Sequence, residues 1–268
     1  MYNTVITAHD MYVARGYHYE WFTHGKTERS MDLFSKVLAH QPEVLSDVTV
    51  IAPSQWLSRV LHTAEVTRNC KAPVVPNFLR KREGLATSFE QLLPKSYFLL
   101  PTSDTKGSRK GFDVGVIGFL NFTGRKQSHD FRLIVGTTKA LGLQSLGIYS
   151  AGELSPELQN TNVLDFGIMR TLMHRARGVI IPSRAENFAN VGVEAIREGT
   201  RLAVSNTGGN PELVANSNHG LLFGNEMPSE LGLALIDLSS KGTDSLTGPN
   251  FLDEDAILIA HEAIWNGV

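Results

Sequence analysis

Two glutamates, Glu186 and Glu194, flank the start of a predicted helix, with seven residues between them. The apolar run Gly178–Pro182 predicts a buried strand, the letters SRAEN a polar turn, and the segment from Asn190 a helix. Parallel sheets bind ligands outside the carboxyl ends of their strands, and a helix N-terminus there offers free N–H groups and a positive dipole to an anion. A carboxylate that faces a sugar accepts hydrogen bonds from two hydroxyls. The spacing therefore predicts a corner that binds a phosphate, with one glutamate on a hexose and the other on a ribose.

The elements that would position this corner alternate between short β-branched runs and helix-length segments of apolar periodicity. This alternation is typical of βαβ units and a mostly parallel sheet, so the predicted fold class is α/β. The expected strands are Asn3–Ala8, Val48–Ala52, Pro73–Pro76, Asp113–Gly118, Leu146–Ser150, Gly178–Pro182 and Arg201–Ser205. The expected helices are Met31–Ala39, Gln55–Ala64, Phe131–Leu141, Met169–Ala176, Val191–Glu198, Leu231–Leu238 and Asp253–Trp265.

The net charge, the apolar content and the number of cysteines exclude several classes of protein. The 268 residues include 25 basic and 27 acidic side chains, a net charge of −2, and 42% are apolar, which excludes a disordered tail or a polycation for nucleic acid. The single cysteine, Cys70, can form neither an internal disulfide nor a thiolate zinc site, so we expect a reducing, cytoplasmic location. No apolar run approaches the roughly 18 residues that span a bilayer, and the N-terminus lacks the pattern of a signal peptide. Any membrane contact is expected to be peripheral, at the inner face.

A change in composition from Arg80 to Gly111, rich in charges and turn formers, predicts a domain boundary. The segment after it is long enough for a complete doubly wound domain, whereas the segment before it offers about three strands. A parallel sheet that starts in mid-fold exposes an edge and an uncovered face. We therefore expect either a shortened start or a partner chain that completes the N-terminal domain.

Longer motifs around the glutamates carry a resemblance to a known family. The block PSRAENFANVGVEAIREGTRLAVSNTGGNPELV, followed by GLLF at Gly220–Phe223, resembles the signature region of the retaining nucleotide-sugar glycosyltransferases of family four. The segments TAHDM at Thr7–Met11, IAPSQWLSRVL and VVPNF are similar to motifs earlier in that family. The resemblance implies a GT-B fold of two Rossmann-like domains, with the N-terminal one incomplete here. The implied division is a partial acceptor-side domain at 1–90, a linker at 91–111, a nucleotide-sugar-binding domain at 112–250, and a C-terminal helix at 251–268 that packs back toward the first domain.

The resemblance also implies roles for single residues. Glu186 would lie by the donor sugar near the reacting centre, Glu194 would bind the ribose hydroxyls, and His9 would line the opposite side of the cleft. The basic pair Arg125 and Lys126 would neutralise the diphosphate leaving group. The implied catalytic residues are thus His9, Glu186 and Lys126, and the implied donor-binding residues are Arg125, Ser183, Phe188, Ala189, Asn190, Val191 and Glu194. The family uses basic side chains in place of a divalent cation, so no metal or other cofactor is expected.

Alternatives remain open for several of these residues. Arg125 and Lys126 could equally form a solvated surface turn, and His9 could be a buried histidine oriented by Asp10. The first duty of Gly208 and Gly209 is expected to be conformational, with Asn210, Pro211 and Glu212 as the N-cap, N1 and N2 residues of a helix.

The resemblance predicts a hexosyltransferase with a UDP- or GDP-sugar donor and a saccharide or lipid-linked saccharide acceptor, in surface polysaccharide or glycan biosynthesis. One alternative is a nucleotide-sugar-binding remnant or subunit that has no transferase activity of its own. A nucleotide-sugar epimerase on the same fold is a third possibility.

Overall fold

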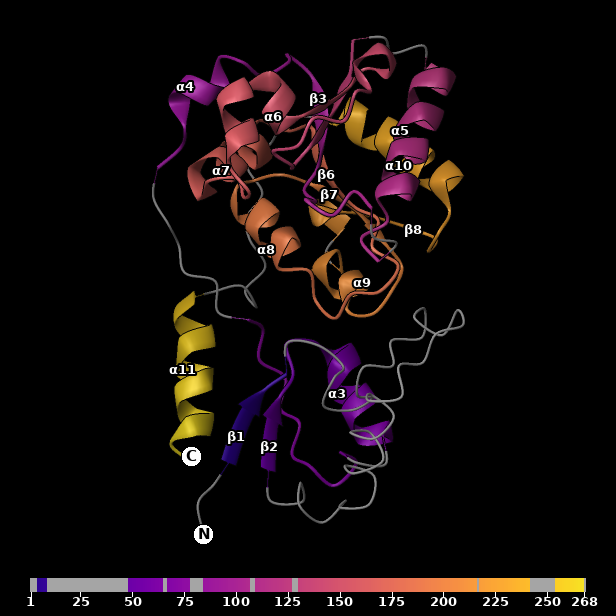
Figure 1. The fold of residues 1–268 in the computed structure, drawn as a ribbon. Helices are drawn as coiled ribbons and strands as arrows, with labels where there is room; N and C mark the ends of the chain where they lie inside the picture. The colour runs from indigo at the N-terminus through magenta and orange to yellow at the C-terminus, as the bar shows by residue number, and fades with distance from the viewer. Residues whose placement is uncertain are drawn as a thin grey trace, which may run out of the picture.

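The computed structural model describes residues 4–8, 48–64, 67–77, 84–106, 109–126, 130–215, 217–241 and 254–267. These residues form two α/β units, which lie one above the other in Figure 1. The N-terminal unit contains the described residues from 4 to 77 and the C-terminal helix. The C-terminal unit contains the described residues from 84 to 241.

The N-terminal unit is built on two parallel strands. Strand β1 (Thr4–Thr7) pairs with β2 (Val48–Ile51), and helix α3 (Gln55–Thr63) follows β2 directly. Beyond α3 the chain returns alongside β2, where two isolated bridges pair Thr49 with Lys71 and Ala52 with Val74. The buried face of α3 packs on this layer through Leu57, Val60 and Leu61.

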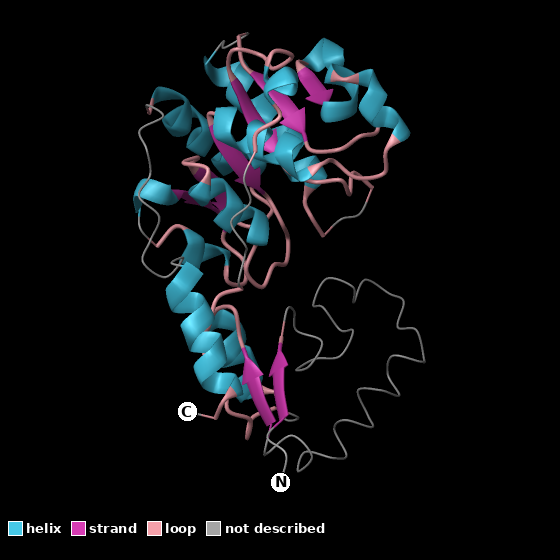
Figure 2. Ribbon diagram, turned by 90° about the vertical axis from the view of Figure 1, so that its left-hand side faces the viewer, coloured by secondary structure: helices cyan, strands magenta, loops and turns pink. Residues whose placement is uncertain are grey.

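Helix α11 (Glu254–Trp265) returns the C-terminus of the chain to the N-terminal unit, where it lies beside β1 in Figures 1 and 2. Its buried residue Ile257 packs against Ile51 and Val75. His261 Nε2 also lies 3.3 Å from the carbonyl oxygen of Pro76.

Within the described residues, the C-terminal unit holds a six-stranded parallel sheet in the order β5-β4-β3-β6-β7-β8. The chain runs outward from β3 through β4 to β5, then returns to β6 beside β3 and runs the other way. This reversal between β3 and β6 is the position at which open α/β sheets form a ligand crevice. The strands are β3 (Tyr97–Leu100), β4 (Arg132–Val135), β5 (Ile148–Ser150), β6 (Gly178–Ile181), β7 (Leu202–Ser205) and β8 (Gly220–Phe223).

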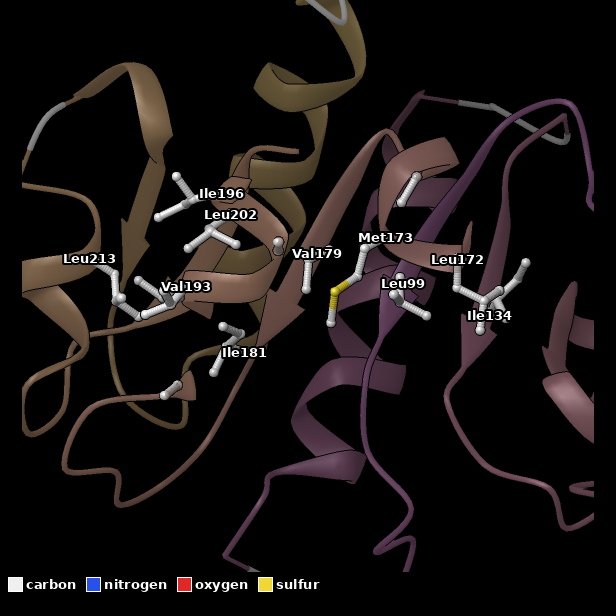
Figure 3. Close-up of a cluster of buried hydrophobic side chains, with 14 of the residues drawn as sticks. Leu99, Ile134, Leu172, Met173, Val179, Ile181, Val193, Ile196, Leu202 and Leu213 are labelled. Carbon is white, nitrogen blue, oxygen red and sulfur yellow. The ribbon is translucent and has the colours of Figure 1, made fainter. Parts of the chain in front are cut away.

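Helices cover both faces of this sheet. On one face α5 (Phe112–Lys126) and α10 (Pro228–Ser240) enclose a core with Phe98, Phe122 and Leu133. On the other face α7 (Phe166–Arg175) and α8 (Asn190–Arg197) pack over the cluster drawn in Figure 3. Shorter helical segments lie at α4 (Thr87–Glu90), Gln144–Leu146, α6 (Ala151–Leu154), Pro156–Asn160, α9 (Asn210–Leu213) and Ser217–His219.

The prediction of a strand at Asp113–Gly118 is wrong, because these residues lie inside helix α5. The β-branched letters of this segment suggested a strand, but its glycines allow a helix to pack unusually closely on two neighbours. A Cβ atom at Gly115 would lie 2.9 Å from the Leu100 side chain of β3, and one at Gly118 would lie 2.4 Å from the Leu231 side chain of α10. The tertiary contacts therefore decide the structure of this segment, whatever its local strand propensity.

The prediction of a helix at Phe131–Leu141 is also wrong, because Arg132–Val135 is strand β4. Strand β3 falls inside the range 91–111 that was expected to be a linker, yet it pairs with both β4 and β6. All four residues of β3 are buried. A strand covered on both faces reads as a short continuous apolar run without alternation, which hides it in the sequence.

Most other predicted elements are confirmed within one to three residues, namely the strands β1, β2, β5, β6 and β7 and the helices α3, α7, α8, α10 and α11. Pro73–Pro76 forms only the bridge at Val74 and not a strand. The predicted helix at Met31–Ala39 lies outside the described residues.

Candidate functional site

A pocket of about 280 Å³ opens at the carboxyl ends of β3 and β6. Its walls come from the segment Pro101–Asp104 after β3, from Arg109 and Lys110 before α5, and from Pro182 and Ser183 after β6. Val191, in the first turn of α8, completes the lining. The pocket therefore occupies the crevice that the strand order predicts.

Helix α8 presents its N-terminus to this pocket. The helix begins at Asn190, and its N-cap Ala189 supplies no side-chain hydrogen bond. The N–H groups of Gly192 and Val193 donate to the carbonyl oxygen of Ala189, whereas those of Asn190 and Val191 precede the first intrahelical bonds. Together with the positive end of the helix dipole, these amides favour an anion at the mouth of α8.

Two cations and one carboxylate meet beside this mouth. Lys110 Nζ lies 2.5 Å from Glu186 Oε2, and Arg109 Nη1 lies 3.6 Å from the same oxygen. The Ser183 hydroxyl also donates to this oxygen, at 3.3 Å. Only 13% of the Glu186 side chain is exposed, against 38% for Arg109 and 31% for Lys110. The two cations thus share one carboxylate, and an anionic ligand would compete with Glu186 for them, while Asp104 is a second acid in the pocket lining.

Two glycines hold the backbone of this group in place. Gly208 has a φ of +56°, and a Cβ atom there would lie 1.6 Å from the carbonyl oxygen of Glu186. Gly111 has a φ of +65°, and its Cβ would lie 2.0 Å from the carbonyl oxygen of Pro182. Glycine is the residue that permits both the left-handed conformation and the close approach. The Gly208 contact thus packs the loop after β7 against the Glu186 turn, and the Gly111 contact packs the segment after Lys110 against the end of β6.

Arg184 links the loops around the pocket. Its guanidinium donates to both carboxylate oxygens of Asp113, at 2.9 and 2.6 Å, and to Glu226 Oε1 at 2.5 Å. Its backbone N–H donates to the carbonyl oxygen of Arg109 at 2.8 Å. Glu226 has a φ of 58°, a conformation that is rare outside glycine and clusters at functional sites. Arg184 thus joins the loop after β6 to the start of α5 and to the loop after β8.

The ion pair with Arg184 should make the stability of the C-terminal unit depend on pH. The hydrogen bond from Arg184 holds the pKa of the Asp113 carboxyl below its usual 3.8. A carboxyl with a lowered pKa in the folded state stabilises the protein above its unfolded pKa and loses that effect as the pH falls through the lowered value. We expect the difference in melting temperature between the wild type and Asp113→Asn to shrink between about pH 6 and pH 3. A difference that stays constant over this range would contradict the pair; its size should be small, since 56% of the Asp113 side chain is exposed.

Of the predicted donor-site residues, Ser183 and Val191 line this pocket. Glu186 contacts the lining residues Ser183, Arg109 and Lys110, and Asn190 is the first residue of α8. Glu194 lies half-buried about one turn further along α8. Phe188 and Ala189 are buried in the core, and neither lines the pocket. His9 lies outside the described residues.

The assignment of Arg125 and Lys126 to the diphosphate needs correction. It assumed a strand that ends at Gly118, but both residues belong to the last turn of α5. That helix starts beside Pro182 and is 15 residues long, about 22 Å at 1.5 Å per residue, so its end lies far from the pocket. The structure puts Arg109 and Lys110 at the pocket in their place. The signal that could have found them is the tripeptide RKG between an apolar run and a helix, which becomes visible once Tyr97–Leu100 is read as a strand.

Two further properties of the described residues complete the picture of the site. No group of three or more histidine, cysteine, aspartate or glutamate side chains lies close enough together to hold a metal ion in the part of the chain that the structure describes. In that same part, no helix combines the length and the apolar character required to cross a bilayer.

One known family matches part of the chain. Residues 121–241 match the family described as Glycosyl transferases group 1. No curated protein matches the sequence.

Several solved structures share the fold. Sucrose-phosphate synthase from Thermosynechococcus elongatus superposes with a TM-score of 0.69 at 16% identity, over 99% of this chain and 68% of that one. WaaG, a glycosyltransferase involved in lipopolysaccharide biosynthesis, gives a TM-score of 0.59 at 16% identity, over 97% and 70%. HepE from Anabaena, solved in complex with UDP and glucose, gives 0.60 at 16% identity, over 98% and 70%. The chain thus spans about two thirds of the length of these proteins. Residues 121–241 therefore match the group 1 glycosyl transferases, and the chain has the α/β fold of the GT-B glycosyltransferases.

Proposed function

We propose that this chain is a retaining glycosyltransferase that transfers a hexose from a UDP- or GDP-sugar to a saccharide or lipid-linked saccharide acceptor. The observation that carries the proposal is the convergence of Arg109, Lys110 and Glu186 with the mouth of α8 around one pocket. Retention of the anomeric configuration is what the resemblance to family four implies. A role in surface polysaccharide or glycan biosynthesis is supported by the likeness to WaaG, itself involved in lipopolysaccharide biosynthesis.

The cations and amides of the pocket suit a diphosphate leaving group. As the bond between sugar and phosphate breaks, negative charge grows on the β-phosphate. Arg109, Lys110 and the first amides of α8 are fixed before the reaction, so they stabilise this growing charge more than the ground state. They also supply the positive charge that a divalent cation would otherwise contribute, and we propose that transfer proceeds without an added metal.

Glu186 has a double role in this proposal. In the free protein its carboxylate is the ion partner of Lys110 and Arg109. A bound diphosphate takes over those cations, and the Glu186 carboxylate then accepts hydrogen bonds from the hydroxyls of the donor sugar. Glu194, further along α8, is proposed to bind the ribose hydroxyls.

Two solved structures of similar fold support the class of ligand. HepE was solved with UDP and glucose. A mutant of TarM from S. aureus, with a TM-score of 0.62 at 12% identity over 98% of this chain and 50% of that one, was solved with UDP, Fondaparinux and α-GlcNAc-glycerol. A nucleoside diphosphate and a saccharide are therefore the ligands to test first.

The proposal is tested by titration calorimetry with UDP, GDP and, as a control, inorganic phosphate, followed by release of nucleoside diphosphate from UDP- and GDP-hexoses with and without oligosaccharide acceptors. We expect one nucleotide to bind and its sugar to be transferred to an acceptor with the anomeric configuration kept, as seen by NMR. Binding without release from any donor would instead indicate a nucleotide-sugar-binding protein. Conversion of the donor sugar without an acceptor would indicate an epimerase.

A further inference from the structure

The two units are joined by a carboxylate that caps a helix of the other unit. Glu212, in α9 of the C-terminal unit, accepts hydrogen bonds from the backbone N–H groups of Gln55 at 2.9 Å and Trp56 at 2.8 Å. These are the first two residues of α3 in the N-terminal unit. Figure 1 shows α9 directly above α3 at the boundary between the units.

Helix α3 lacks an acidic residue of its own in its first turn. A carboxylate at a helix N-terminus is stabilising because it meets both the free N–H groups and the positive end of the dipole. The N-cap Ser54 satisfies the N–H of Leu57 at 3.0 Å. Glu212 supplies the charge for the remaining amides from across the boundary, so the favourable interaction exists only while the units are together.

The same boundary touches the turn that carries Glu186. The Ser54 hydroxyl donates to Asn187 Oδ1 at 2.9 Å, and both side chains are buried. A Cβ atom on Gly209 would lie 2.8 Å from the Ser54 Cβ and 2.0 Å from the carbonyl oxygen of Asn187, so this contact is close-packed. Asn77 Nδ2 donates to Asn190 Oδ1, on the first residue of α8, at 2.8 Å.

We propose that Glu212 is a positioning residue whose carboxylate holds the units closed, so that the N-terminus of α3 supports the Glu186 turn and the mouth of α8. Glu212 is not among the residues that line the pocket, so it acts through Asn187, Asn190 and their neighbours. The role in transfer rests on the proposed function, whereas the closed arrangement itself does not. The proposed nucleotide contacts lie within the C-terminal unit. Loss of the hydrogen bonds from Gln55 and Trp56 to Glu212 should therefore lower kcat and leave the affinity for UDP nearly unchanged.

Three variants separate this role from simple capping of α3. Glu212→Ala removes the carboxylate. Gln55→Glu, at an exposed position, gives α3 an acidic first turn of its own but places a like charge against Glu212. Glu230→Ala is the matched control, because that carboxylate accepts from the backbone N–H of Gly224 at 2.7 Å within its own unit.

The distance between the units is measured by fluorescence energy transfer in the protein without ligand, with labels on His62→Cys and Ser229→Cys, which are exposed in α3 and α10. Cys70 is buried and stays in place. Since hydrogen bonds to a charged group are strong, we expect Glu212→Ala and Gln55→Glu each to lower the ratio of closed to open molecules and the kcat by roughly tenfold or more. Glu230→Ala should match the wild type.

If the distance between the two labels in Glu212→Ala equals that in the wild type, the inference is overturned. A closed, fully active Gln55→Glu overturns it as well, because a role limited to capping α3 would tolerate that change. A wild type that binds neither UDP nor GDP overturns the proposed function instead, while the distance measurement still decides whether Glu212 closes the units.

Discussion

Lys110→Ala is expected to lower the rate of sugar transfer by about 10²–10³-fold, the usual loss when one preorganised group that stabilises developing charge is removed. Lys110 lines the pocket, and its ammonium is 2.5 Å from Glu186 beside the first amides of α8. Among the residues that the structure describes, no other lysine lines this pocket. The loss should appear mainly in kcat, because the charge on the leaving phosphate grows as the bond breaks.

The control for this prediction is Arg125→Ala, which removes a cation from the exposed end of α5. Both variants should keep the circular dichroism and the melting behaviour of the wild type, and release of nucleoside diphosphate is then compared at equal protein concentration. We expect Arg125→Ala to retain the full rate. If the transfer rate of Arg125→Ala falls as far as that of Lys110→Ala, the original assignment of the diphosphate to Arg125 and Lys126 would be supported instead.

Glu186→Ala is expected to separate binding from transfer. Without the carboxylate, Lys110 and Arg109 lose their ion partner, so the pocket becomes more positive and the affinity for UDP should rise by about two- to tenfold, as expected for a charge a few ångströms away. Transfer should nevertheless fall by roughly 10²-fold, because the hydrogen bonds to the donor sugar are gone. Calorimetry with UDP and a transfer assay on the same preparation measure the two effects.

Glu157→Gln, which removes one negative charge from an exposed segment away from the pocket, is the matched control for overall charge. It should change neither the affinity for UDP nor the transfer rate. Weaker binding of UDP by Glu186→Ala than by the wild type would mean that the carboxylate helps to hold the nucleotide. The proposal that the diphosphate replaces Glu186 as the ion partner of Lys110 and Arg109 would then be wrong.

The corner around α8 was predictable because local signals agree there. An apolar strand, a polar turn and a helix of clear amphipathic period follow one another between Gly178 and Arg197, and the structure keeps all three. The conformational role of the glycine pair was also predictable, although the helix starts one residue earlier than expected, with Gly209 as N-cap and Asn210 already inside it. Local sequence is sufficient where the structure is set by neighbours in the chain.

The rest depends on contacts between distant segments. Strand β3 is buried on both faces, so its sequence lacks the alternation of a half-exposed strand. Segment α5 is a helix because Gly115 and Gly118 permit close packing on β3 and α10. No local pattern reveals either contact. Because the strand was predicted at Asp113–Gly118 and not at β3, the phosphate was assigned to the basic residues at the end of α5 and not to Arg109 and Lys110. The bond from Glu212 to the start of α3 joins residues more than 150 positions apart and could be found only in the folded chain.

The central claim is that the pocket between β3 and β6 holds the diphosphate of an activated sugar. A crystal structure of the protein with bound UDP tests it most directly. The account predicts phosphate oxygens within about 3 Å of Lys110 Nζ and of the backbone nitrogen of Val191. Diphosphate density at any other place, such as the end of α5 beside Arg125, would contradict the account.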